Sequence, residues 1–302
     1  MNARIDFYSR IELIRDLSDN PLLMDTFPHN DAHNTRAAIL RNGLVVSAFS
    51  LLESYLQRRV DETIVEMQRS QIGYSMLGEK LRKLLSLDAI IGLATRLGFT
   101  DKAERLAFAE ANIVRLAGGP ALPINYTGLG FSPKGSNVSG DDIQTLLAAF
   151  GVQSPWQCIG NVISSLGATR LSARDDFLNF ARARNKAAHD STTNIATSDL
   201  KTYLDTALLV GMASDIIVTN AVAAFVSERT PTSATNLANA LPLSYRFLDR
   251  DQNGLFKEKV STIGRTIRLH PDKESAVSSA LRRARRLTIV VRDSRATPIE
   301  LI

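Results

Sequence analysis

The residues best suited to chemistry in this 302-residue chain are Arg184 and His189, which stand five positions apart. Histidine titrates near neutral pH and can therefore donate or accept a proton. Arginine stays charged and presents a planar fork that fits phosphate oxygens. Metal-free cleavage of RNA requires one proton to leave the 2′-hydroxyl, one proton to reach the 5′-oxygen, and positive charge beside the phosphate. This pair of side chains can supply all three.

The spacing of the two residues restricts how they can share a site. Five residues along an α-helix turn roughly 500°, so the two side chains leave the helix about 140° apart. Either Arg184 reaches around the helix, or a second copy of the chain completes the site. Asn185 and His189 lie four positions apart on one face, where Asn185 could orient the imidazole or the phosphate. A helix C-terminus favours the charged form of His189, which suits a general acid.

The segment that carries these residues is predicted to be a helix. Ser172 with Asp175 gives a capping-box-like start, and the turn formers from Asp190 to Asn194 end the helix. Apolar periodicity predicts further helices elsewhere in the chain. They cover residues 7–18, 34–68, 77–97, 102–117, 141–150, a segment after Pro155, and 198–228. The chain is therefore predicted to be mainly α.

Two regions depart from this helical pattern. Residues 118–140 contain six glycines and three prolines, which predicts either a functional lid or a short hairpin. Beyond residue 241, strand-like segments flank Asn253 and Gly254, a strong hairpin signal. Residues 271–286 are predicted to form a basic helix and residues 287–291 a buried strand. We therefore predict a helical domain over 1–229 and a small α+β module over 241–302.

Positive charge is concentrated near the C-terminus. The chain has a formal charge of +5, and residues 229–302 hold 14 Lys and Arg against 7 Asp and Glu. Such a region is suited to a polyanionic partner such as RNA. Four arginines in five positions could contact phosphates or could simply be solvated, and both interpretations stay open. The candidate nucleic-acid contacts are Lys186, Arg282, Arg283, Arg285 and Arg286.

No metal ion or cofactor is predicted. His29 and His33 have the spacing of a zinc-binding pair, but they lie in a loop sequence without an obvious third ligand. The segment from Asp249 to Gly254 matches the first half of a calcium loop, but Val260 stands at the twelfth position instead of glutamate. Surface histidines and a hairpin turn are the simpler interpretations.

The sequence favours a reducing, cytoplasmic setting without a membrane span. The single cysteine, Cys158, cannot form an internal disulfide. The N-terminus lacks the apolar region of a signal peptide. Residues 207–226 approach membrane length, but Asp215 and Asn220 near the middle favour a buried bundle helix.

Arg184, four intervening residues and His189, with polar Asn185 directly after the arginine, resemble the motif of the HEPN superfamily. The segment from Arg41 to Glu53, the glycine-rich insert and the segment from Asn137 to Gly151 resemble the larger HEPN variants of the RiboL-PSP kind. The resemblance covers roughly residues 5–228 and leaves the C-terminal module unexplained. It implies a HEPN-like helical bundle.

The resemblance also implies an activity and a site. It implies a metal-independent endoribonuclease that leaves 2′,3′-cyclic phosphate ends, with Arg184 and His189 catalytic and Asn185 assisting. Glu53 corresponds to an acid on the second helix that holds the arginine or histidine in place, although a helix-surface glutamate is the alternative. The resemblance further implies a homodimer and a role as a prokaryotic toxin or anti-phage effector with an antitoxin or defence-system partner. Ser191 stands where adenylylated toxins carry tyrosine, so that form of control is not implied.

Three other interpretations stay open. The chain could be a non-catalytic HEPN module that binds nucleic acid or a protein partner through its basic C-terminal module. It could be a purely structural helical subunit of a larger complex. Arg184 and His189 could also merely form ion pairs on a helix surface.

Overall fold

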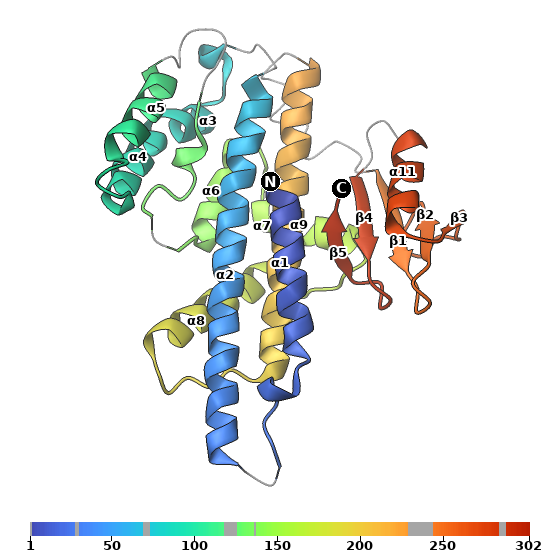
Figure 1. The fold of residues 1–302 in the computed structure, drawn as a ribbon. Helices are drawn as coiled ribbons and strands as arrows, with labels where there is room; N and C mark the ends of the chain where they lie inside the picture. Colours follow the sequence, from blue (N-terminus) through green and yellow to red (C-terminus); the bar gives the residue numbers. More distant parts are fainter. Residues whose placement is uncertain are drawn as a thin grey trace. The chain divides into compact units, whose positions relative to one another are not determined.

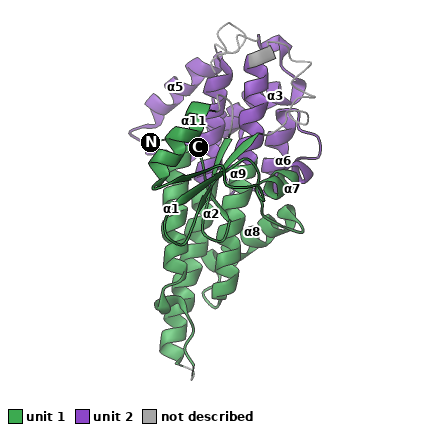
Figure 2. Ribbon diagram, turned by 90° about the vertical axis from the view of Figure 1, so that its right-hand side faces the viewer, with its two compact units in different colours: residues 1–52, 159–213, 242–302 green, residues 53–158, 214–241 purple. Residues whose placement is uncertain are grey.

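The computed structural model describes residues 2–27, 30–68, 73–117, 126–135, 137–228, 244–283 and 288–302. The fold is mainly helical with one small sheet near the C-terminus, which confirms the predicted fold class (Figure 1). The chain divides into two compact units, coloured separately in Figure 2. Unit 1 contains residues 1–52, 159–213 and 242–302, and unit 2 contains residues 53–158 and 214–241.

Most of the helices lie close to their predicted positions. They are α1 (Ala3–Ser18), α2 (Asp31–Met67), α3 (Glu79–Lys83), α4 (Ala89–Phe99), α5 (Arg105–Ala117), α6 (Gly140–Ala149), α7 (Pro155–Ser165), α8 (Ala173–His189), α9 (Thr197–Glu228) and α11 (Lys273–Arg283). Short 3₁₀ turns cover Pro21–Leu23, Tyr74–Met76 and Gly128–Gly130. Each of α2 and α9 contributes residues to both units.

Aromatic packing holds α8 in unit 1. The ring of Phe49 on α2 lies 5.9 Å from Phe177 and 5.0 Å from Phe180, both on α8. Phe180 also stacks on Tyr203 of α9, with centroids 5.4 Å apart and planes 10° apart. Removing a buried ring of this kind costs about 3–5 kcal/mol. The position of the helix that carries Arg184 and His189 is therefore fixed by its buried face.

Both predicted helix caps are present. The Ser172 hydroxyl accepts a hydrogen bond from the Asp175 N–H at 3.2 Å at the start of α8. Ser139 and Asp142 form a reciprocal capping box at the start of α6. Each cap satisfies backbone donors that the first helical turn leaves unpaired. The predicted starts of these two helices are therefore confirmed to within about one residue, as helix bounds allow.

The segment predicted as one helix over 77–97 differs in detail. The helical run begins at Glu79, passes through a π-helical turn at Leu84–Asp88 and continues as α4 to Phe99. A β-carbon on Gly130 would lie 1.9 Å from the Leu84 carbonyl oxygen, and one on Gly92 would lie 2.0 Å from the Leu129 carbonyl oxygen. Close backbone packing in unit 2 therefore requires these glycines, and at Gly130 it explains part of the glycine-rich insert.

The described parts of the insert, residues 126–135 and 137–139, contain no strand. The Gly128 N–H donates a hydrogen bond to Asp61 Oδ1 at 2.6 Å, which ties the insert to α2 within unit 2. The remaining residues of the insert, 118–125 and 136, lie outside the described residues. Whether the insert acts as a lid stays a prediction.

The C-terminal module is a five-stranded mixed sheet with α11 on one face. Its strands are β1 (Tyr245–Arg250), β2 (Phe256–Lys259), β3 (Arg268–His270), β4 (Thr288–Arg292) and β5 (Pro298–Leu301). The strand order is β3-β2-β1-β4-β5, with β1 and β4 parallel and the other pairs antiparallel. Ala276 and Ala280 of α11 pack against a buried apolar cluster on the sheet. The predicted hairpin around Asn253 and Gly254 is confirmed, with Gly254 at φ +83°.

The module also contacts α1 within unit 1. Arg15 NH2 lies 3.5 Å from Asp293 Oδ2 and 3.7 Å from Asp205 Oδ1 of α9. The predicted linker, around residues 229–243, lies outside the described residues. The boundary between a helical domain over 1–229 and a module over 241–302 therefore stays a prediction.

Two helices are long and apolar enough to cross a membrane by length and composition alone, Asp31–Met67 and Thr197–Val226. In the second, 78% of the most apolar window is buried inside the protein. Asp215 in this helix accepts hydrogen bonds from the Tyr55 hydroxyl at 2.7 Å and from Arg59 Nε at 2.9 Å. These contacts satisfy a buried carboxylate within unit 2, as a core helix requires. The absence of a membrane span stays a prediction.

Candidate active site

The last two turns of α8 present Arg184, Asn185, Lys186 and His189. Arg184 is half-buried, and the other three side chains are exposed. Arg184 NH1 donates a hydrogen bond to Asn185 Oδ1 at 3.2 Å. Arg184 Nε is buried and lacks a hydrogen-bond partner within the described residues. The His189 side chain makes no hydrogen bond or ion pair in the same part of the chain. The ring of His189 is thus left for a ligand, whereas the unpaired Nε of Arg184 is covered by protein.

Neither residue is neutralised by an acid. Among the residues that the structure describes, neither Arg184 nor His189 takes part in an ion pair. The interpretation of the motif as a pair of surface ion pairs therefore has no support from these residues. An arginine without an acidic partner keeps its charge available for an anion.

Asp190 ends the helix directly after His189. Its Oδ1 accepts a hydrogen bond from the Thr192 hydroxyl at 2.6 Å and another from the Thr192 N–H at 2.9 Å. These hydrogen bonds, with a smaller contribution from the charge of Lys186, lower the pKa of Asp190. The carboxylate therefore closes a local turn that fixes where the backbone goes after His189.

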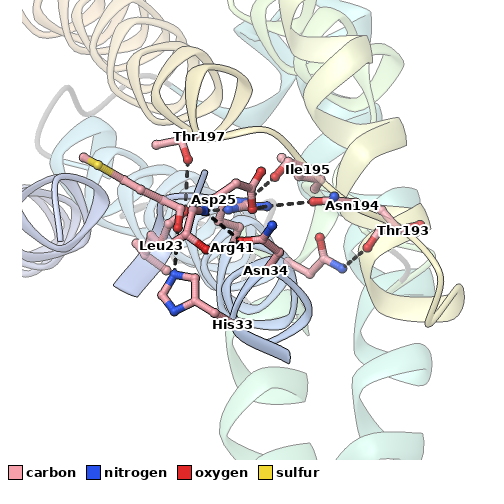
Figure 3. A network of polar contacts seen from close by, with 12 residues as sticks. Leu23, Asp25, His33, Asn34, Arg41, Thr193, Asn194, Ile195 and Thr197 are labelled. Carbon is pink, nitrogen blue, oxygen red and sulfur yellow. Dashed lines mark hydrogen bonds and ion pairs between the residues drawn. The ribbon is translucent and has the colours of Figure 1, made fainter. Parts of the chain in front are cut away.

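A buried arginine on α2 holds the loop that follows α8 (Figure 3). Arg41 is 0% exposed, although it carries a charge. Its NH2 donates to Asn194 Oδ1 at 2.7 Å and to Asp25 Oδ1 at 3.1 Å. Its Nε and NH1 donate to the carbonyl oxygens of Ile195 and Leu23. All these contacts lie in unit 1, and they fix the loop behind the Arg184–His189 motif.

Neighbouring residues extend this network. Asn42 Nδ2 donates to the Thr193 carbonyl oxygen at 2.6 Å, and the Thr197 hydroxyl donates to the Leu23 carbonyl oxygen at 3.1 Å. Nε2 of His33 lies 2.9 Å from the Met24 carbonyl oxygen. His33 therefore has a structural partner, whereas His29 lies outside the described residues. The described residues contain no group of three or more His, Cys, Asp or Glu side chains that could hold a metal ion.

Sequence reasoning missed Arg41 and Asn42 as supports of the site. A signal was present, because Arg41 lies four positions after Ala37 and four before Val45, two fully buried residues on the core-facing stripe of α2. A charged residue on such a stripe must be paired or hydrogen-bonded.

A groove of about 840 Å³ lies between α8 and the first turns of α9, and it belongs wholly to unit 1. Asn185 and Lys186 line it, whereas Arg184 and His189 are not among its lining residues. The structure therefore brings two of the predicted site residues to one groove. Its polar and aromatic lining also includes Asp176, Asn179, Arg182, Asp190, Asn194, Asp199 and Tyr203.

Glu53 lies in unit 2, where its carboxylate accepts a hydrogen bond from the Val138 N–H. This contact ties α2 to the residues that precede α6. It gives Glu53 a role in holding unit 2 together. The predicted role of Glu53 beside Arg184 or His189 stays a prediction.

The predicted nucleic-acid contacts of the C-terminal module differ in their surroundings. Arg282 is exposed, and its Nε donates to the Ser278 carbonyl oxygen at 3.2 Å. Arg283 donates to Ser279 Oγ at 2.6 Å and lies 3.5 Å from the buried carboxylate of Glu258. Part of the charge of Arg283 is therefore neutralised by Glu258 within the module. Arg285 and Arg286 lie outside the described residues.

Comparison with known proteins gives one result. A family model described as RiboL-PSP-HEPN matches residues 5–220. The matched range contains α8 with Arg184 and His189, the support from α2, and the groove. No curated protein and no solved structure matches the chain significantly.

Proposed function

The chain belongs to the RiboL-PSP-HEPN family, and from this premise we propose that it is a metal-independent endoribonuclease. HEPN proteins include many ribonucleases, and the predicted catalytic residues are Arg184 and His189. The observation that carries the proposal is the exposure and the lack of acidic partners of these residues at the end of α8. His189 is exposed, Arg184 is half-buried, and both lack acidic partners among the described residues.

The proposed reaction uses only groups of the protein and the RNA. The 2′-oxygen attacks the adjacent phosphorus while the bond from phosphorus to the 5′-oxygen breaks, which gives a 2′,3′-cyclic phosphate and a 5′-hydroxyl. A charged His189 donates the proton that the 5′-oxygen needs. Arg184 binds the non-bridging oxygens and stabilises the charge that develops there. Asn185 accepts a hydrogen bond from Arg184 and so orients the guanidinium.

We further propose that the working enzyme is a homodimer. The side chains of Arg184 and His189 leave α8 about 140° apart, so one helix does not aim both at the same phosphate. Two α8 helices around a two-fold axis would place an arginine of one copy near a histidine of the other. In this arrangement each composite site pairs Arg184 of one copy with His189 of the other, which donates the proton to the leaving 5′-oxygen, while the 2′-proton passes to solvent.

The proposed biological setting is that of a cytoplasmic toxin or anti-phage effector. An RNA-cleaving enzyme must be restrained in the cell that makes it, which implies an antitoxin or another defence-system partner. RNA is the proposed substrate, and the family provides the expectation of a prokaryotic defence role.

Incubation of the purified protein with total RNA in EDTA tests the activity. We expect fragments with cyclic phosphate ends from the wild type and none from His189→Ala or Arg184→Ala. Arg174→Ala is a matched control, because Arg174 is exposed on the same helix and outside the motif. Identical fragment patterns from the wild type and His189→Ala would refute the proposal.

A non-catalytic nucleic-acid-binding module is the second candidate function. The observation that favours it is the exposed Arg282 within a region that holds 14 Lys and Arg against 7 Asp and Glu. It predicts salt-sensitive RNA binding that is lost on replacing Arg282, Arg283, Arg285 and Arg286 and kept in His189→Ala. RNA cleavage that depends on His189 would decide against it.

A further inference from the structure

The groove between α8 and α9 carries more acid than base. Its acidic lining residues are Asp176, Asp190 and Asp199, whereas Arg182 and Lys186 are its basic ones. A surface with this balance does not favour the phosphate backbone of RNA. Its volume of about 840 Å³ is nevertheless in the range of small-molecule sites. A neutral group with donors and acceptors on its edge is a better match than an anion.

One hydrogen-bond donor in the groove has a fixed direction. Asn194 Oδ1 accepts a hydrogen bond from Arg41 NH2 at 2.7 Å, and Arg41 is fully buried. A guanidinium can only donate, so the contacting atom of Asn194 must be its oxygen. The Nδ2 group of Asn194 is therefore the end that can donate to a ligand.

One carboxylate in the groove has no hydrogen-bond or ion-pair partner within the described residues. Asp190 is bonded to Thr192, and Asp176 Oδ2 lies 3.9 Å from Arg170 NH1. By contrast, the carboxylate of Asp199 is exposed and has no hydrogen bond or ion pair within the described residues. Its two oxygens can accept a pair of hydrogen bonds side by side.

A rigid aromatic ring borders the same space. Tyr203 lines the groove and is held by parallel stacking on Phe180 at 5.4 Å. Burial, and next the charge of Asp199 one helical turn earlier, raise the pKa of Tyr203, so its phenol stays neutral. A neutral ring beside amide and carboxylate groups is the combination that proteins use for unpaired RNA bases.

We propose that this groove binds an unpaired nucleobase of the RNA, next to the phosphate on which Arg184 and His189 act. Guanine fits the three groups best, because its N1–H and N2–H₂ donors suit the carboxylate of Asp199 and its O6 suits the amide of Asn194. Lys186 also lines the groove and would contact the adjoining phosphate. The proposal rests on the proposed ribonuclease function, and it assigns the substrate preference of that enzyme.

Short RNAs that differ at one base test this assignment. They carry guanine, inosine, adenine or no base next to the cleaved bond, and inosine lacks only the N2 amine of guanine. We expect the wild type to cleave the guanine substrate about tenfold faster than the inosine substrate, measured as kcat/KM. Asp199→Asn should remove this difference and should cleave the abasic substrate as fast as the wild type does.

Asp175→Asn is the matched control, because Asp175 is an exposed acid of α8 outside the groove. It should keep the preference for guanine. If Asp199→Asn slowed the guanine and abasic substrates equally, or left the preference unchanged, the assignment would be wrong.

Binding measurements distinguish a wrong assignment of the base site from a wrong assignment of the ribonuclease activity. The same RNAs with a 2′-deoxy sugar at the cleavage position cannot react, and their affinity is measured by fluorescence anisotropy. If the wild type cleaved no RNA but bound the guanine RNA more tightly than the inosine RNA, and Asp199→Asn did not, the base site would stand without the nuclease. Equal affinities for all four RNAs would overturn it.

Discussion

The end of α8 and the C-terminal module both carry arginines, but the two regions use them differently. In the module, Arg292 is 2% exposed and makes a bidentate pair with Asp249 at 2.6 and 2.8 Å. At the end of α8, Arg184 has no acidic partner among the described residues and keeps an unpaired Nε. The module therefore uses part of its positive charge in a buried ion pair, whereas Arg184 is not neutralised by an acid among the described residues.

The largest expected effect on stability comes from the arginine of the module. Replacing Arg292 by Met leaves the carboxylate of Asp249 buried without its main partner, which should lower the free energy of unfolding by about 3–5 kcal/mol. Arg184→Met should change it by no more than about 0.5 kcal/mol, because only an exposed hydrogen bond to Asn185 is lost. Urea unfolding of both variants measures the loss in the free energy of unfolding. Equal losses in the two variants would contradict the contrast between the two arginines.

The same pair should make the module sensitive to acid. Burial raises the pKa of Asp249, but hydrogen bonds from Arg292 and Lys259 outweigh this effect and hold the pKa below the ordinary aspartate value. The pair therefore stabilises the folded state fully above this value, and the stabilisation is lost as the pH falls toward the folded pKa. Between pH 6 and pH 3 the wild type should lose more stability than Asp249→Asn. If the stability of the two proteins fell in parallel with pH, the pair of Arg292 and Asp249 would not be the source of the acid sensitivity.

A smaller effect is expected where α2 supports the loop after His189. Asn42→Ala removes the hydrogen bond to the Thr193 carbonyl oxygen, which should cost about 1 kcal/mol of stability. Because that loop follows the helix that carries the proposed catalytic residues, the variant should lower kcat for RNA more than it changes KM. Arg174→Ala, a change in an exposed residue of α8 outside the groove, serves as the comparison. Unchanged kcat in Asn42→Ala would show that the loop does not position the site.

The sequence predicted those features that depend on local physics. Ser172 and Ser139 mark helix starts because their hydroxyls satisfy backbone donors nearby. The pair Asn253 and Gly254 marks a hairpin because Gly254 takes a positive φ. The family resemblance added Arg184 and His189, and the match over residues 5–220 supports that resemblance.

Features that depend on packing between distant segments were not predicted. Strands β3 and β5 are short and have mixed composition, so no alternation reveals them. The π-helical turn before α4 forms where Gly130 meets the backbone of Leu84. The groove likewise needs Asn194, Asp199 and Tyr203 beside α8, and their juxtaposition arises only when α9 folds back along that helix.

Mixing two inactive variants tests the central claim most directly, because the claim is that Arg184 and His189 act together across two copies of the chain. Arg184→Ala and His189→Ala proteins are each assayed on RNA in EDTA, alone and after unfolding and refolding together. We predict no cleavage by either variant alone and restored cleavage by the mixture, since a mixed dimer holds one intact arginine and one intact histidine on opposite copies. A mixture as inactive as its components, with mixed dimers present by mass, would contradict this account.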